Sequence, residues 1–228
     1  MSEKAVAAQP AMARKSDADL QLDVEEELRW DPSIHAEQVG VSVKNGVVEL
    51  DGHVDSLWEK WAAERAAMRV AKVKSVASEI NVEPPPSAVR TDEDIAHAAS
   101  NHIEWNSLVP KTVKVQVTEG VVTLQGTVEW QYQKKEAEQG LLRLTGVKSI
   151  LNRITLNPKV SAAGVKTRIE DALKRNAEID ATRIKVETSD GTVTLRGNVR
   201  SWTEREEVEH AAWAAPRVTK VESHLMIS

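Results

Sequence analysis

Residue types that could catalyse a reaction or bind a metal are present, but their spacing argues against both. The six histidines occupy unrelated positions, and His97 and His102 stand five residues apart instead of the i, i+4 spacing of a helical zinc pair. Cysteine is absent, which excludes thiolate catalysis and cysteine-bound metal. No serine has a histidine at a recognisable motif spacing. The sequence therefore predicts a protein that is not an enzyme and has no cofactor and no metal site.

The residues best suited to binding gather in the stretch that follows Ser56. At about 100° per residue, a helix here turns its alanines and valines to one face and its indoles and cations to another. The second face consists of Trp58, Trp61, Arg65, Met68, Arg69 and Lys72. Indoles sit at the headgroup level of a bilayer and basic side chains meet lipid phosphates. This face is therefore a candidate contact with a phospholipid surface or a protein partner.

A packing role for the same face stays open. Trp58 and Trp61 can instead pack against a neighbouring unit or stack under Arg65. Acidic residues earlier in the chain weaken attraction to anionic lipid: Asp23, Glu25, Glu26 and Glu27. The matching faces of two later helices are mainly polar, with Tyr132, Lys135, Gln139, Leu142 and Arg143 in one and Thr203, Glu206, His210, Trp213 and Arg217 in the other. This polarity predicts that the face points away from the core of its own unit. Three further tryptophans are interpreted as packing residues at helix ends: Trp30, Trp105 and Trp202.

The elements that position these residues come in three copies of one pattern. A decapeptide recurs as NGVVELDGHV at 45–54, EGVVTLQGTV at 119–128 and DGTVTLRGNV at 190–199. Alternating apolar residues after an Asn-Gly or Asp-Gly pair indicate a hairpin, because both turn positions need a positive φ. The second glycine is expected to end the strand and to allow a strained backbone or a close helix–strand approach. The predicted structural glycines are Gly46, Gly52, Gly120, Gly126, Gly191 and Gly197.

Each copy lies within a longer unit of five elements. An amphipathic helix comes first, followed by a loop whose apolar plug is Ile34, Leu108 or Ile179, the hairpin, a second helix and a last strand. Capping boxes begin the second helices at Ser56 with Glu59 and at Ser201 with Glu204, whereas Trp130 replaces the serine in the middle unit and predicts a weaker cap. The predicted fold class is α+β. Three tandem αββαβ units are expected, each a small three-stranded sheet of mixed direction with two helices on one face.

The domain organisation follows from these units. The predicted parts are a flexible tail at 1–15, unit 1 at 16–83, a proline-rich linker at 84–90, unit 2 at 91–157, a short joint at 158–160 and unit 3 at 161–228. Each unit is near the lower size limit at which a domain folds alone, so packing between units should add to stability. The arrangement of the units and the oligomeric state stay open.

Charge and hydropathy narrow the choice of partners. Lys+Arg against Asp+Glu is 7 to 15 in residues 16–83 and 11 to 11 in residues 161–228, so no basic stripe is available to a nucleic acid. No apolar run is long enough to span a membrane, and residues 1–15 lack the apolar core of a secretory signal. The expectation is no nucleic-acid partner, no transmembrane segment and a cytoplasmic location. A periplasmic location is the alternative if an export signal is missing from this sequence.

The hairpin pattern V-x-V-x-x-G-x-V-x-L-x-G-x-V within an αββαβ unit resembles the BON domain. Its residues in the first copy are Val41, Val43, Gly46, Val48, Leu50, Gly52 and Val54, and the third copy departs from the pattern at Thr188. The resemblance implies tandem non-enzymatic units of the kind found in bacterial envelope-stress proteins and linked to phospholipid surfaces. We therefore expect a stress-associated binding module that contacts phospholipid or envelope surfaces. The alternative is a soluble scaffold that binds a protein partner, or itself, through exposed tryptophans.

Overall fold

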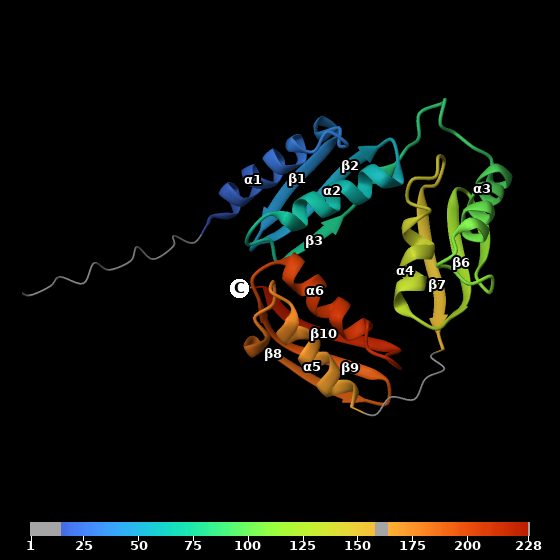
Figure 1. Ribbon diagram of the computed structural model, residues 1–228. Helices are drawn as coiled ribbons and strands as arrows, with labels where there is room; N and C mark the ends of the chain where they lie inside the picture. The colour runs from blue at the N-terminus through green and yellow to red at the C-terminus, as the bar shows by residue number, and fades with distance from the viewer. Residues whose placement is uncertain (1–14, 158–163, 228) are drawn as a thin grey trace, which may run out of the picture.

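The computed structural model describes residues 15–157 and 164–227, and all structural statements below concern these residues. The predicted tail lies outside them except for Lys15, and the predicted joint at 158–160 lies outside them entirely. Three αββαβ units follow one another along the chain, each with its own sheet and its own hydrophobic core (Figure 1). The predicted α+β class and the mixed strand directions are therefore confirmed.

Unit 1 shows the topology of all three units. Its elements are α1 (Asp17–Trp30), a short 3-10 turn η1 (Ala36–Gln38), β1 (Val39–Lys44), β2 (Val47–Val54), α2 (Leu57–Arg69), β3 (Ser75–Ser78) and β4 (Asn81–Val82). β2 is central, with β1 antiparallel on one side and β3 and β4 parallel on the other. The last strand, predicted as one piece, is interrupted between Ser78 and Asn81, so this sheet has four strands in place of three.

Units 2 and 3 repeat this order with an unbroken last strand. Unit 2 consists of α3 (Asp92–Trp105), β5 (Lys114–Thr118), β6 (Val121–Val128), α4 (Gln131–Gln139) and β7 (Ser149–Leu156). Unit 3 consists of α5 (Val165–Arg175), η2 (Ala181–Arg183), β8 (Ile184–Ser189), β9 (Thr192–Val199), α6 (Trp202–Trp213) and β10 (Lys220–Ile227). The middle strand of each sheet again pairs antiparallel with the first strand and parallel with the last.

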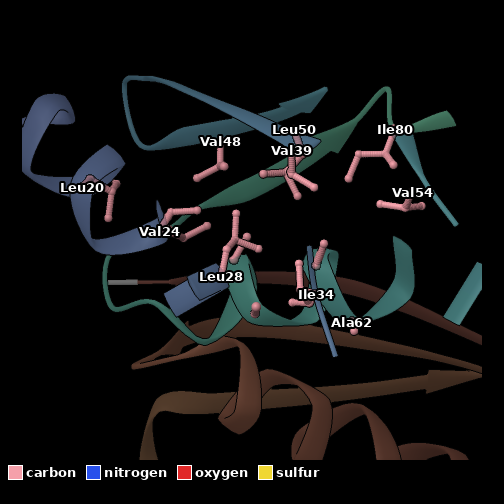
Figure 2. Close-up of a cluster of buried hydrophobic side chains, with 14 residues drawn as sticks. Leu20, Val24, Leu28, Ile34, Val39, Val48, Leu50, Val54, Ala62 and Ile80 are labelled. Atoms are coloured by element: carbon pink, nitrogen blue, oxygen red, sulfur yellow. The ribbon is translucent and has the colours of Figure 1, made fainter. Parts of the chain in front are cut away.

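The core of unit 1 lies between its two helices and one face of the sheet. Leu20, Val24 and Leu28 project from α1 toward Val48 and Leu50 of β2 (Figure 2). α2 contributes only alanines to this core among its apolar residues, which lets the helix lie close to the sheet. Each unit thus buries one stripe of each helix and one sheet face.

The loop plug was predicted correctly in two units out of three. Ile34 and Ile179 are buried, but Leu108 is 48% exposed. The neighbouring Val109 occupies the core of unit 2 instead. The prediction of Leu108 is therefore wrong by one residue, since Leu108 and Val109 are adjacent and only Val109 is buried.

The repeated glycines adopt backbone conformations that side chains disfavour. Both residues of each turn have positive φ, with values of 55° at Asn45 and 80° at Gly46, as predicted. The second glycine does not end the strand, because β2 continues through Gly52 to Val54. Gly52 has a φ of 111°, and a Cβ there would overlap the carbonyl oxygen of Gln38. The close approach is therefore between β2 and the last residue of the 3-10 turn η1, and not between β2 and the helix that follows it.

Candidate functional site

The second helix of every unit presents its outer face to another unit. α2 lies against α6, and α4 faces α6 (Figure 1). A cleft lies between α4 and α6. The cleft is lined by residues that the sequence placed on the polar second faces: Tyr132, Lys135, Gln139, Glu206, His210 and Trp213. The predicted orientation away from the unit's own core is wrong for Trp213, which packs against the core of unit 3, and for Leu142, which is buried. Leu142, Arg143 and Arg217 also lie beyond the ends of α4 and α6. We call the region where α2, α4 and α6 approach one another the central joint.

Side-chain oxygens accept hydrogen bonds from backbone N–H groups at the start of α2 and of α6. Ser56 Oγ accepts a hydrogen bond from the Glu59 backbone N at 3.2 Å, as the capping pattern predicted. The buried Glu59 carboxylate accepts from the backbone N of Asp55 at 3.1 Å and of His35 at 2.7 Å. The Glu59 carboxylate therefore bonds to Asp55, the residue before the cap, and to His35 in the loop before β1. The second bond connects that loop to α2. Ser201 and Glu204 repeat this arrangement in unit 3.

Unit 2 replaces the carboxylate with an amide. Gln133 Oε1 accepts from the backbone N of Glu129 at 3.0 Å and of Trp130 at 3.1 Å. Trp130 supplies no side-chain acceptor, and α4 has nine residues whereas α2 has 13. The strength of this cap, which the sequence predicts to be lower, stays a prediction.

Two ionisable groups at these caps have shifted pKa values. Burial raises the pKa of Glu204, but hydrogen bonds from the backbone N–H groups of Arg200 and Asp180 and from the Arg200 guanidinium outweigh burial, so the net pKa is lowered. Glu204 is therefore held as an anion that organises the chain around it. The hydrogen bond and the charge of Glu59 raise the pKa of His35.

The two indoles of α2 lie where unit 1 meets unit 2. The Trp58 and Trp61 rings stack with centroids 4.9 Å apart and planes inclined by 28°. The guanidinium of Arg143, from unit 2, lies 3.9 Å from the Trp58 ring, and that of Arg65 lies 5.5 Å from the Trp61 ring. Leu57 also packs against the unit 2 core. We call Trp58 and Trp61 the joint indole pair; their geometry corresponds to the packing alternative raised from the sequence.

Polar contacts join unit 1 to unit 3. Arg65 of α2 forms an ion pair with Glu206 of α6. The Trp202 Nε1–H donates to the carbonyl oxygen of Val73 at 3.1 Å, and the Arg205 guanidinium covers the Trp202 ring at 4.9 Å. Trp202 is therefore a packing residue, as predicted, and α2 contacts both other units.

The other three members of the predicted α2 face, Met68, Arg69 and Lys72, do not lie together. Arg69 bonds to Glu27 of α1 at 2.8 Å and lies 3.5 Å from Asp31, so its guanidinium serves unit 1 itself. Met68 is half-buried. Lys72 lies beyond the helix, because α2 ends at Arg69 where Val70 turns extended. The prediction that all six residues share one helix face is therefore wrong for Lys72.

Two tryptophans expected to pack at helix ends lie in solvent. Trp30 is 84% exposed and Trp105 is 82% exposed. Each follows the last core residue of its helix, Leu28 or Ile103, by two positions. This offset places both indoles off the buried stripe, a signal that was present in the sequence. We call Trp30 and Trp105 the exposed indole pair.

The cleft between α4 and α6 has a volume of about 790 Å³. Aromatic rings enter it from both sides, with Trp130 and Tyr132 from unit 2 and Trp213 from unit 3. Carboxylates line it as well, but Glu206 and Glu209 are already engaged by Arg65 and Arg205. The cleft is thus an amphipathic space between units, and two of the three carboxylates that line it are paired.

Within residues 15–157 and 164–227, no group of three or more His, Asp or Glu residues is placed to hold a metal ion. No helix in these ranges has both the length and the apolar character needed to cross a bilayer.

The three hairpins and their αββαβ frame place the chain in a known class. The BON domain family matches residues 16–84, 91–158 and 161–228, and the chain belongs to this family. It is similar to osmotically-inducible protein Y of Escherichia coli strain K12, with 31% identity over 125 residues. The matched region covers 53% of this chain and 62% of that relative, so it spans less than two thirds of the relative's length.

Solved structures with lower similarity belong to secretion systems. CdsD of the type III secretion system of Chlamydia trachomatis is 17% identical over 92% of both chains, with a TM-score of 0.26. The periplasmic domain of the inner membrane protein PrgH from S. typhimurium is 14% identical over 84% of this chain and 95% of that chain, with a TM-score of 0.21. Similarity at this level carries no inference about the present chain.

Proposed function

We propose that the chain is a non-catalytic, stress-associated binding protein whose exposed indole pair contacts phospholipid surfaces. The exposure of Trp30 and Trp105, 84% and 82%, carries this proposal, because the same position of two repeats leaves a large amphipathic ring in water. Indoles are enriched at lipid headgroups, where one edge is apolar and the other hydrated. The association with stress rests on the similarity to osmotically-inducible protein Y.

The joint indole pair supports lipid contact less well. Arg143 and Arg65 already cover the Trp58 and Trp61 rings. The cations that would meet lipid phosphates have carboxylate partners, Arg65 with Glu206 and Arg69 with Glu27. Lipid contact through α2 therefore requires the units to separate, whereas Trp30 and Trp105 are available in the structure as it stands.

The charge around the exposed indole pair sets the expected salt dependence. Unit 1 carries 7 basic against 15 acidic residues, so anionic lipid does not attract it. Partition of the indoles should dominate, and screening by salt should change binding little. Weak dependence on anionic lipid is therefore part of the proposal.

Co-sedimentation with vesicles of phosphatidylcholine and phosphatidylglycerol at two salt concentrations tests this function. Trp30→Ala with Trp105→Ala should abolish pelleting, and Trp58→Ala with Trp61→Ala should retain it. Full pelleting of the Trp30/Trp105 variant would contradict the assignment of these two residues. Absence of pelleting by the wild-type chain would contradict lipid contact altogether.

The soluble scaffold remains the second candidate, because the same exposed indoles fit a protein surface. The scaffold predicts that the chain does not pellet with vesicles. It also predicts that the chain captures a defined protein, or a second copy of itself, and that this capture depends on Trp30 and Trp105. The cytoplasm stays the predicted compartment and the periplasm the alternative; fractionation of cells that carry the tagged chain distinguishes them.

A further inference from the structure

Two guanidinium groups border the cleft between α4 and α6, and each contacts an indole and a carboxylate. The Arg65 guanidinium lies 5.5 Å from the centre of the Trp61 ring and forms an ion pair with Glu206. The same three groups recur within unit 3, with 4.9 Å from guanidinium to ring and 2.9 Å from guanidinium nitrogen to carboxylate, in Trp202, Arg205 and Glu209. The carboxylates of both sets line the cleft. The central joint therefore uses one arrangement twice: indole, guanidinium and carboxylate.

The cleft also contains indoles and a carboxylate that no arginine of the described residues contacts. Its aromatic lining is Trp130, Tyr132 and Trp213. In the part of the chain that the structure describes, neither a cation nor a second aromatic ring is stacked on any of these three rings. Glu136 lines the cleft as well, is half-buried, and forms no ion pair with a described residue. Two of the three groups of the arrangement are therefore present in the cleft.

One repeated position decides which unit supplies its own arginine. Nine residues after the N-cap of the second helix, unit 1 has Arg65, unit 2 has Gln139 and unit 3 has His210. Gln139 and His210 both line the cleft. A glutamine amide carries no charge, and neither side chain has the planar fork of donors that a guanidinium has. Units 2 and 3 therefore turn this position toward the cleft without the cation that unit 1 has there.

The size and charge of the cleft suit a small organic cation. Its volume of about 790 Å³ lies in the range of pockets that hold small ligands. Lys135 and His210 line the cleft and oppose a positive charge, but both side chains are exposed, so water and salt screen them. The half-buried carboxylate of Glu136 is screened less. The favourable charge is therefore located beside the aromatic rings of α4.

We propose that the cleft binds an external guanidinium group, from an arginine side chain of a peptide or from a small guanidinium compound. The planar cation stacks on an indole, Trp130 or Trp213, and donates hydrogen bonds to the carboxylate of Glu136. Tryptophan is the best aromatic partner for a cation, and a guanidinium can donate two parallel hydrogen bonds to one carboxylate. The site uses neither Trp30 nor Trp105, so it is independent of the lipid contact proposed above.

Titration of the ¹⁵N-labelled full chain with argininamide, at ionic strength held constant with sodium chloride, tests this site through the indole N–H signals of the seven tryptophans. Saturable shifts are expected for Trp130 and Trp213. The signals of Trp58, Trp61 and Trp202 should not shift, because an arginine of the chain already covers each ring. Lysinamide has the same charge and should bind about fivefold more weakly, because an ammonium lacks the planar fork. Equal shifts at all seven indoles, or no saturable shift in the cleft, would overturn the proposal.

Three variants separate the site from a general effect of charge. Glu136→Gln removes the free carboxylate and should weaken argininamide binding about fivefold. Glu104→Gln is the matched control, because it removes an exposed carboxylate of unit 2 that does not line the cleft, and it should leave the affinity unchanged. Gln139→Arg places a guanidinium of the chain at the position of Arg65 and should weaken binding by a similar factor. Unchanged affinity in both the Glu136→Gln and the Gln139→Arg chains overturns the site.

A second titration separates the two sources of the guanidinium. A tripeptide Gly-Arg-Gly with blocked ends should shift the Trp130 and Trp213 signals at least as tightly as argininamide if the cleft accepts an arginine side chain of a peptide. Saturation by argininamide without a response to the tripeptide identifies a small guanidinium compound as the ligand. No response to either probe overturns the site.

Discussion

Units 1 and 3 share one backbone frame and differ at the residues that point out of it. At a constant offset of 145 positions, Asp17, Trp30, His35 and Trp61 of unit 1 correspond to Ala162, Arg175, Asp180 and Glu206 of unit 3. The core stripe of the first helix and the hairpin glycines are kept. The repeated residues therefore build the frame, whereas the residues at these four positions differ between the two units.

Loss of the second hairpin glycine should destabilise units 1 and 3 by similar amounts. Gly52→Ala and Gly197→Ala should each destabilise their unit by about 2 kcal/mol or more, because of the positive φ and the overlap of the new Cβ with a backbone carbonyl. Hydrogen exchange of each unit's core amides in the full chain measures the loss. Gly164→Ala is the control: φ is +75° there, but no atom of the described residues lies within 4 Å of the new Cβ, so its loss should be smaller. Equal losses in all three variants would show that steric overlap is not the cause.

The stability of the central joint should depend on the joint indole pair of unit 1 and not on the exposed indole pair. Replacing Trp58 and Trp61 by Ala removes two cation–π contacts, which are worth about 0.5–1 kcal/mol each, together with the stacked pair. Small-angle scattering should show a larger radius of gyration, and the melting temperature should fall. The Trp30→Ala, Trp105→Ala chain should match the wild type in both measurements. The reverse pattern would mean that the joint is not held by α2.

The carboxylate of Asp17 at the hairpin turn should contribute less to the stability of unit 1 than Gly52 does. Asp17→Ala removes two hydrogen bonds at a partly exposed site and should destabilise unit 1 by about 1 kcal/mol. Hydrogen exchange of the core amides of unit 1 in the full chain measures the loss. A stable unit 1 after loss of Asp17 would show that the turn does not need the carboxylate.

A weak pH dependence is expected in unit 1 and not at the matching site of unit 3. Because Glu59 raises the pKa of His35 above its usual 6.5, protonated His35 stabilises the folded unit. This contribution is complete below pH 6.5 and is lost as the pH rises through the raised pKa. Unit 3 has Asp180 at this position, which donates only its backbone N–H. Exchange rates of unit 1 measured from pH 6 to pH 8, corrected for intrinsic exchange, should show the loss, and His35→Gln should remove it. The same loss in the His35→Gln chain would assign it to another group.

The sequence predicted the frame well because its determinants are local. The four-residue spacing of Leu20, Val24 and Leu28 and the positive φ at Asn45 and Gly46 are set by nearby residues. The prediction for Trp30 is wrong because this residue stands two positions after Leu28, off the core stripe of α1, and an aromatic ring there meets solvent. The return bond of Glu59 was predicted for the cap residue, but the loop before β1 also competes for that carboxylate.

The central joint was predictable only in part. The polar second faces showed that α2, α4 and α6 point away from their own cores. Which surfaces they meet depends on contacts between units, such as Arg143 over Trp58, and no periodic pattern links those two residues.

Quenching of tryptophan fluorescence by brominated phospholipids tests most directly whether the exposed indole pair reaches the membrane. If Trp30 and Trp105 carry the contact, vesicles with bromines near the headgroup quench the wild-type chain and the Trp58→Phe, Trp61→Phe chain alike. The Trp30→Phe, Trp105→Phe chain then loses nearly all of this quenching. Undiminished quenching in that chain, with loss in the Trp58→Phe, Trp61→Phe chain, would move the contact to α2 and contradict the proposed function of the exposed pair.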